Sequence, residues 1–290
     1  MGTNNKVRRR FPGLRTLLSL PETRGFDIDD PRTTDLRRGV IRYNPFLKGI
    51  YEEWYALLSS RIPPGPGKIL ELGSGAGFLA DYVPEAITSE VFCCKGVRAV
   101  LDGRQLPFAP SSMRAIVLVD VLHHLPETRP FLIEAERCLR PGGAVLLIEP
   151  WVSTWSRFIY GRLHDEPFEP DSKQWGFPAK GPLSGANGAL PWIVFNRDRS
   201  TFEEEFPSFR IREVRPMMPL RYLVSGGVSM RQFMPAASFR LWTFVDHWLS
   251  RWPQRWPMFA LIDIRKILTP DYDDSGRNVD SRPRLRPRLG

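Results

Sequence analysis

Three glycines spaced two residues apart, Gly73, Gly75 and Gly77, form the pattern in this sequence with the clearest chemical meaning. A short apolar run at 69–72 precedes them, and residues 78–83 have the composition of a helix start. A strand that turns through glycines into a helix N-terminus exposes backbone N–H groups, and a nucleotide-like ligand can lie against them. The pattern therefore predicts a cofactor site of the nucleotide type.

Three further blocks follow the glycine turn in order. They are Asp102 with Leu-Pro-Phe at 106–108, the pair His123-His124 after Val121-Leu122, and Leu-Arg-Pro-Gly-Gly at 139–143. Together with Glu71 and the glycines, the ordered set resembles the class I S-adenosylmethionine-dependent methyltransferases. The closest resemblance is to the subgroup that methylates small molecules, lipids and quinones. It covers residues 68–150, about a quarter of the chain.

The resemblance implies a role for each polar residue at the predicted strand ends. Glu71 would help to hold the turn and the amino group of the cofactor, Glu90 would accept the ribose hydroxyls, and Asp102 would accept the adenine amino group. Asp120 and the histidines would lie beside the transferable methyl group. The implied cofactor-binding residues are Glu71, Gly73, Gly75, Gly77, Glu90, Asp102 and Asp120.

Histidines supply the candidate catalytic bases, because an imidazole can accept a proton near neutral pH. The order of preference is His124, His123 and then His164. The run His164-Asp165-Glu166 could form a general-base site, a metal site or a solvated surface turn. The cysteines have no metal-ligand spacing, and no metal is predicted.

Two other functions stay open at this stage. A nicotinamide-dependent oxidoreductase could use the same turn, but its fingerprint Gly-x-Gly-x-x-Gly read from Gly75 meets Ala80 at the third glycine position. That function also gives no reason for the Leu-Pro-Phe and Arg-Pro-Gly-Gly blocks. A non-catalytic protein that keeps the fold and the cofactor is the other alternative.

Strands and helices alternate through the same region. Strands are predicted at 69–72, 86–92, 98–101, 115–119 and 144–148, and helices at 45–61, 78–83 and 128–139. This alternation favours an α/β, Rossmann-like, open and mostly parallel sheet with flanking helices. Only residues 92–97 separate the second and third strands, which is too short for a helical crossover. The helix there should be missing or reduced, leaving the adenine side of the site more open.

A long insertion follows the fifth strand. Residues 151–200 and 216–256 are predicted to build the acceptor side, while strands at 209–214 and 259–264 complete the sheet. The run 191–195 is expected to pack in the core or to line the acceptor pocket. The predicted domains are a loosely packed or disordered extension at 1–40, a methyltransferase domain at 41–268 and a disordered tail at 269–290. The aromatic content of the insertions favours a small, apolar or lipid-like acceptor.

Charge and composition limit the partners. The net charge is +9, but arginines concentrate at the two ends of the chain among Pro, Gly, Asp and Ser, which is typical of solvated tails, so nucleic acid is an unlikely partner. The few cysteines and the lack of a long apolar run indicate a cytoplasmic protein. Trp and Arg interleave at 240–256, which is compatible with a packed helix or with peripheral contact to a membrane surface.

Overall fold

The computed structural model describes residues 30–163, 166–179, 181 and 185–267. The predictions for residues 1–29, for His164 and Asp165, and for the tail at 269–290 lie outside the described residues. Within the described part, no helix is long and apolar enough to cross a membrane.

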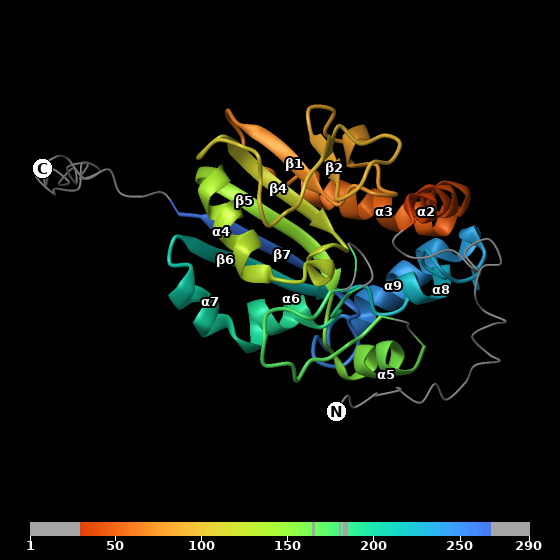
Figure 1. Ribbon diagram of the computed structural model, residues 1–290. Helices are drawn as coiled ribbons and strands as arrows, with labels where there is room; N and C mark the ends of the chain where they lie inside the picture. Colours follow the sequence, from red (N-terminus) through yellow and green to blue (C-terminus); the bar gives the residue numbers. More distant parts are fainter. Residues whose placement is uncertain (1–29, 164–165, 180, 182–184, 268–290) are drawn as a thin grey trace, which may run out of the picture.

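A seven-stranded sheet organises the fold, in the order β3-β2-β1-β4-β5-β7-β6 (Figure 1). Strand β7 runs antiparallel to its neighbours β5 and β6, and the other pairs are parallel. This confirms the predicted Rossmann-like, mostly parallel sheet. The strands are β1 (Lys68–Leu72), β2 (Ile87–Glu90), β3 (Ala99–Val100), β4 (Met113–Val119), β5 (Leu139–Pro150), β6 (Phe209–Met217) and β7 (Phe259–Lys266).

The connections around β2 are short. No helix lies between β2 and β3, as the spacing predicted, and Arg98 N donates directly to the carbonyl of Thr88 at 2.9 Å. The helix predicted at 78–83 is wrong in type, because this segment forms a single 3-10 turn, η2 (Leu79–Asp81). Pro84 explains the difference, since a proline removes an N–H donor and disfavours the helical conformation of the residue before it.

Strand β4 is buried on both faces. Ile116 and Leu118 pack in one apolar cluster, with α4 (Thr128–Cys138), α6 (Leu190–Trp192), the π-helical turn η4 (Ile193–Arg197) and α7 (Arg199–Glu205). Ala115 and Val117 pack in the other, with α3 (Pro45–Ser59). Side chains alternate between faces along a strand, so one apolar run serves both clusters. The run 191–195 belongs to the first cluster, which confirms core packing there.

Helices α2 (Pro31–Tyr43), α8 (Arg221–Ser225) and α9 (Phe239–Leu249) gather with α3 at one end of the sheet (Figure 1). Buried Arg221 joins them, because its guanidinium pairs with Asp246 of α9 at 2.9 Å and with Glu53 of α3 at 2.8 Å. Asn44 adds a 2.9 Å hydrogen bond to the Ser225 carbonyl. The short helices α5 (Thr154–Leu163) and η5 (Ala236–Ser238) belong to the same insertions. Helix α2 spans the boundary placed at residue 40, and the division into domains stays a prediction.

Candidate active site

The glycine turn leaves β1 at the carboxyl edge of the sheet. Gly73 and Gly75 have φ values of +68° and +38°, a region that glycine enters without strain. A Cβ on Gly75 would lie 2.9 Å from Glu90 Oε1, and one on Gly77 would overlap the hydroxyl of Tyr55. The turn therefore depends on glycine for its conformation and for the close approach of its neighbours.

Glu71, at the end of β1, is the buried carboxyl of this turn. Its side-chain atom Oε2 is buried without a hydrogen-bond partner. Burial raises the pKa of Glu71 to about 8; hydrogen bonds from Ser74 and Tyr55 act against this shift, and the charge of Glu90 adds to it. An unpaired buried acceptor is costly, and a cationic ammonium group would satisfy it.

Glu90 ends β2 and lies beside the turn, where a ribose-binding carboxylate was expected. It is buried, and its Oε2 accepts a hydrogen bond from the Val91 N–H at 3.0 Å. Burial raises the pKa of Glu90, while hydrogen bonds from Val91 and Gly75 and the charges of Arg37 and Arg38 act in the opposite direction.

Asp102 follows β3 and is more exposed than the two glutamates. Arg104 donates to both of its carboxylate oxygens, with Nη2 2.7 Å from Oδ2, and this pair lowers the pKa of Asp102. An ionised carboxylate offers about four acceptor positions, so the pair leaves room for one more donor. An open cavity of about 710 Å³ lies beside the pair, lined in part by Arg104, Glu127 and Trp175.

Glu149 organises the loop after β4. It is fully buried at the end of β5; its Oε1 accepts from the N–H groups of Val121 at 2.9 Å and Leu122 at 2.6 Å, and its Oε2 lies 2.8 Å from His123 Nδ1. No motif in the sequence indicates a role for Glu149. The available signal was a lone carboxylate closing the apolar run 144–148.

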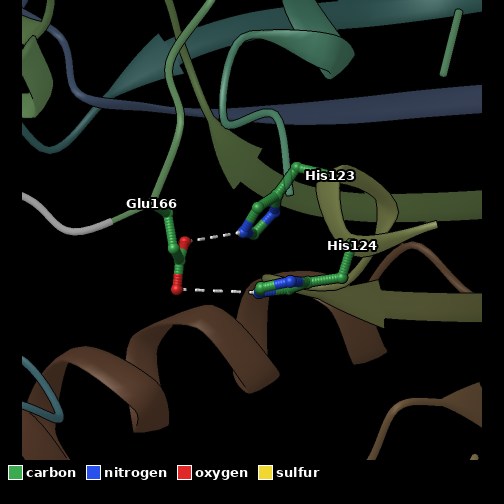
Figure 2. Close-up of side chains that lie close together, drawn as sticks. All are labelled: His123, His124 and Glu166. Carbon is green, nitrogen blue, oxygen red and sulfur yellow. Dashed lines mark ion pairs between the residues drawn. The ribbon is translucent and has the colours of Figure 1, made fainter. Parts of the chain in front are cut away.

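The histidine pair lies on the 3-10 turn η3 (Leu122–His124), and both rings face one carboxylate (Figure 2). His123 Nε2 is 3.5 Å from Glu166 Oε2, and His124 Nε2 is 3.9 Å from Glu166 Oε1. The second ring nitrogen of His124, Nδ1, lies 3.2 Å from the carbonyl of Gly185. Glu166 belongs to the insertion after β5. It therefore links this insertion to the end of β4, beside the two histidines predicted as bases.

Charges make the two histidines unlike each other. Burial acts to lower the pKa of His123, but its bonds to Glu149 and Glu166 and the charge of Asp120 raise it well above the usual value. Burial and the neighbouring charge of His123 lower the pKa of His124 to about 4. Burial and the charges of Glu149 and Glu166 raise the pKa of Asp120 to about 6, against the pull of His123 and Arg37.

Helix α2 contacts the cofactor edge directly. Arg38 Nη2 donates to the carbonyls of Gly75 and Lys95, both at 2.6 Å. Buried Thr34 lies 3.8 Å from the position of a Cβ on Gly75. Residues 31–43 carry no motif, so neither Arg38 nor Thr34 could be predicted as part of the site.

Three tyrosines from different elements lie within electrostatic range of Asp120. They are Tyr51 of α3, Tyr160 of α5 and Tyr222 of α8. Burial raises the pKa of each hydroxyl, and the charge of Asp120 adds to the effect. The end of β4 is therefore surrounded by aromatic groups that no local pattern pointed out.

Comparison with known proteins identifies the class. Residues 70–147 match the family described as "Methyltransferase domain", which is roughly a quarter of the chain. This stretch contains the glycine turn, Glu90, Asp102, Asp120 and both histidines. The chain therefore carries a class I, S-adenosylmethionine-dependent methyltransferase domain on the expected sheet, and the protein is an enzyme of that class.

Solved structures with a related arrangement have low sequence identity. One is geranyl diphosphate C-methyltransferase from Streptomyces coelicolor A3(2), crystallised with Mg²⁺, geranyl diphosphate and S-adenosyl-L-homocysteine: 11% identity, TM-score 0.48, covering 76% of this chain and 82% of that one. Another is an S-adenosylmethionine-dependent methyltransferase from Mesorhizobium loti: 16% identity, TM-score 0.42, covering 72% of this chain and 96% of that one. The search of curated proteins gave no match.

The residues at the carboxyl edge fit the cofactor of this class. Glu71 offers an unpaired buried oxygen, and the bare main chain at Gly75 leaves a space that a Cβ would occupy. The donor set also matches the chemistry of the molecule: carboxylates suit its ammonium group, its ribose hydroxyls and its adenine amino group. The roles of Glu71, Glu90, Asp102 and Asp120 in binding stay predictions.

Proposed function

We propose that the enzyme methylates a small, apolar or lipid-like acceptor held between the end of β4 and the helices of the insertions. The observation that supports this acceptor class is the set of tyrosines around Asp120. Tyr51, Tyr160 and Tyr222 come from three elements, and burial raises the pKa of each. Aromatic side chains largely removed from water favour contact with an apolar or ring-bearing molecule.

The cofactor, when bound, supplies a methyl group on a sulfonium, and transfer breaks the S–CH₃ bond with its electron pair staying on sulfur. The residues of the chain align the acceptor for in-line attack. His123, held by Glu149, fixes the loop at the end of β4. His124 directs Nδ1 to the Gly185 carbonyl, so its Nε2 faces Glu166 at the acceptor side of the loop.

A chain-length series tests the acceptor class. We expect release of S-adenosylhomocysteine with 4-alkylphenols to rise with chain length, by about fourfold in kcat/KM per added methylene at about 0.8 kcal/mol each. Tyr222 stacks on Trp54 at 5.8 Å, so Tyr222→Phe should keep this preference and Tyr222→Ala should reduce it. Turnover confined to polar acceptors, or a preference unchanged in Tyr222→Ala, would contradict the proposal.

A membrane surface is the partner proposed for α9. Leu241, Phe244 and Trp248 of this helix are 63%, 71% and 49% exposed, at the spacing of one helix face. Asp246 is the one acidic residue of 239–256, and it is buried against Arg221. Exposed arginines flank the apolar face: Arg240, Arg251 and Arg255. Apolar and basic groups together suit an anionic bilayer interface.

Sedimentation with vesicles tests this contact. The protein should bind phosphatidylcholine vesicles that contain phosphatidylglycerol more tightly than pure phosphatidylcholine, and added salt should weaken the binding. Phe244→Glu with Trp248→Glu should abolish it, whereas Tyr43→Glu, an exposed aromatic on α2, should not. Equal sedimentation of the double variant and the native chain would contradict the contact.

A further inference from the structure

We propose that His123, His124 and Glu166 bind a divalent transition-metal ion. This departs from the sequence analysis, which predicted no metal. We propose further that the ion holds an oxygen atom of the acceptor, and this second part alone rests on the proposed function.

The distances among the three side chains are close to those of a metal site. One ligand atom from each residue lies within 4.8 Å of the others, and the two closest histidine–carboxylate separations are 3.5 Å and 3.9 Å. Two ligand atoms that each lie about 2.0–2.2 Å from a tetrahedral ion are about 3.4 Å apart. The two separations from Glu166, 3.5 Å and 3.9 Å, are close to this value.

Both imidazoles are oriented as metal ligands are. Nδ1 of His123 faces the Glu149 carboxylate at 2.8 Å, and Nδ1 of His124 faces the Gly185 carbonyl at 3.2 Å. With Nδ1 committed to these acceptors, Nε2 is the nitrogen of each ring that can bind an ion, and on His123 the ion would replace the Nε2 proton. Both Nε2 atoms then point to the same carboxylate (Figure 2). Metal-binding histidines in proteins are commonly oriented in this way by a carboxylate or a backbone carbonyl.

The surrounding charge favours a cation at this point. Asp120 Oδ1 lies 4.0 Å from His123 Nε2, so three carboxylates, those of Asp120, Glu149 and Glu166, surround the pair of histidines. A second set, Asp120, His123 and Glu149, also has donor atoms within reach of one ion. It is the weaker candidate, because the oxygens of Glu149 already accept from Val121, Leu122 and His123.

The ligand types indicate the kind of metal and its use. Two imidazoles and one carboxylate suit Zn²⁺, Co²⁺, Mn²⁺ or Fe²⁺ better than Mg²⁺ or Ca²⁺. Three protein ligands leave at least one position open. A hydroxyl of the acceptor bound there would lose its proton to bulk water more easily, and its oxygen, held as the anion, would then form the new bond to the methyl carbon. The site therefore points to an oxygen-methylated acceptor.

Titration of the full chain with Co²⁺ tests the site, with visible absorption reporting the ligands. We expect one Co²⁺ per chain and competition by Zn²⁺. Glu166→Gln and His124→Ala should each weaken Co²⁺ binding at least tenfold, whereas His247→Ala, which removes an exposed histidine on α9, should leave it unchanged. Thermal unfolding of each variant confirms that it is folded.

Failure of the metal site and failure of the proposed function give different results. A native chain that binds S-adenosylhomocysteine in calorimetry but no Co²⁺ would overturn the metal site and leave methyl transfer standing. Co²⁺ binding that is unchanged in both Glu166→Gln and His124→Ala would overturn it too. If stoichiometric Co²⁺ binding is lost in these variants and the enzyme turns over 4-alkylanilines but no 4-alkylphenols, the metal site is supported and its proposed role in holding an acceptor oxygen is overturned.

Discussion

The cofactor edge and the acceptor side of this enzyme are built in different ways. At the cofactor edge, Glu71, Glu90 and Asp102 stand at or just after the ends of strands, and the glycine turn presents main chain. On the acceptor side, groups far apart in sequence meet: His124 with Gly185 across 61 residues, Arg221 with Glu53 across 168, and Asn44 with Ser225 across 181. A local motif can therefore specify the donor site, while the acceptor site depends on the packing of helices.

The acceptor side should be the more sensitive to loss of one buried charge. Arg221→Ala leaves Asp246 buried without its partner, and the two side chains are only 6% and 4% exposed. Breaking such a pair costs about 3–5 kcal/mol. Urea unfolding should show this loss in free energy of unfolding, with little change in Arg240→Ala, an exposed arginine nearby. A loss below about 1 kcal/mol would mean that the network does not hold the helices.

The cofactor edge should be the more sensitive to one added side chain. Gly75→Val combines a φ of +38° with a contact to Glu90 Oε1, so we expect at least about 100-fold weaker binding of S-adenosylmethionine, or about 2.7 kcal/mol. Calorimetric titration measures this loss of affinity. Gly161→Ala adds a methyl where no atom lies within 4 Å and should bind as the native chain does. Equal affinities in all three proteins would refute the pocket.

Glu71 should make the stability of the cofactor-free protein depend on pH. Its pKa of about 8 in the folded state exceeds that of the unfolded chain, so the folded state keeps a proton that the unfolded chain releases above about pH 4.5. Ionisation of Glu71 therefore costs no stability below about pH 4.5. As pH rises toward 8 the free energy of unfolding falls, by at most about 1.4 kcal/mol per pH unit.

Glu71→Gln should flatten this slope in urea unfolding measured from pH 5 to 8, and Glu85→Gln, on the surface, should not. A native chain whose stability rises over this range in the same way as that of Glu71→Gln would contradict the buried, protonated carboxyl.

The smallest expected effect concerns Asp102. Asp102→Ala removes one predicted hydrogen bond to the adenine amino group and should weaken cofactor binding about tenfold. Glu127→Ala is the control, because Glu127 also pairs with Arg104, at 3.3 Å, without that predicted contact. If the two variants lose affinity equally, the ion pairs of Arg104 matter and the adenine contact does not.

Much of the sheet could be predicted from the sequence, since buried strands are short apolar runs between glycines and prolines. The run 115–119 predicted β4, and the short spacing at 92–97 predicted the missing helix. Residues 78–83 were predicted as a regular helix ended by Pro84, and only the 3-10 turn η2 forms there. Strands with a regular local pattern were therefore predicted correctly, and the errors came from segments that a single residue alters.

The partners of the site residues could not be predicted in the same way. Glu149 meets His123 because β4 and β5 are neighbours in the sheet, which no spacing within either strand reveals. Glu166 was noticed only as part of the run 164–166, and its approach to both histidines depends on how the insertion packs. Arg38 contacts the glycine turn from a helix without a motif.

The most direct test of the division between the two sides is calorimetric titration of S-adenosylhomocysteine into the native chain and into the double variant His124→Ala, Glu166→Gln. We predict one binding site per chain in both proteins and affinities within about threefold, because the changed groups lie on the acceptor side. Absence of binding to the native chain, or loss of binding in the double variant, would contradict the account.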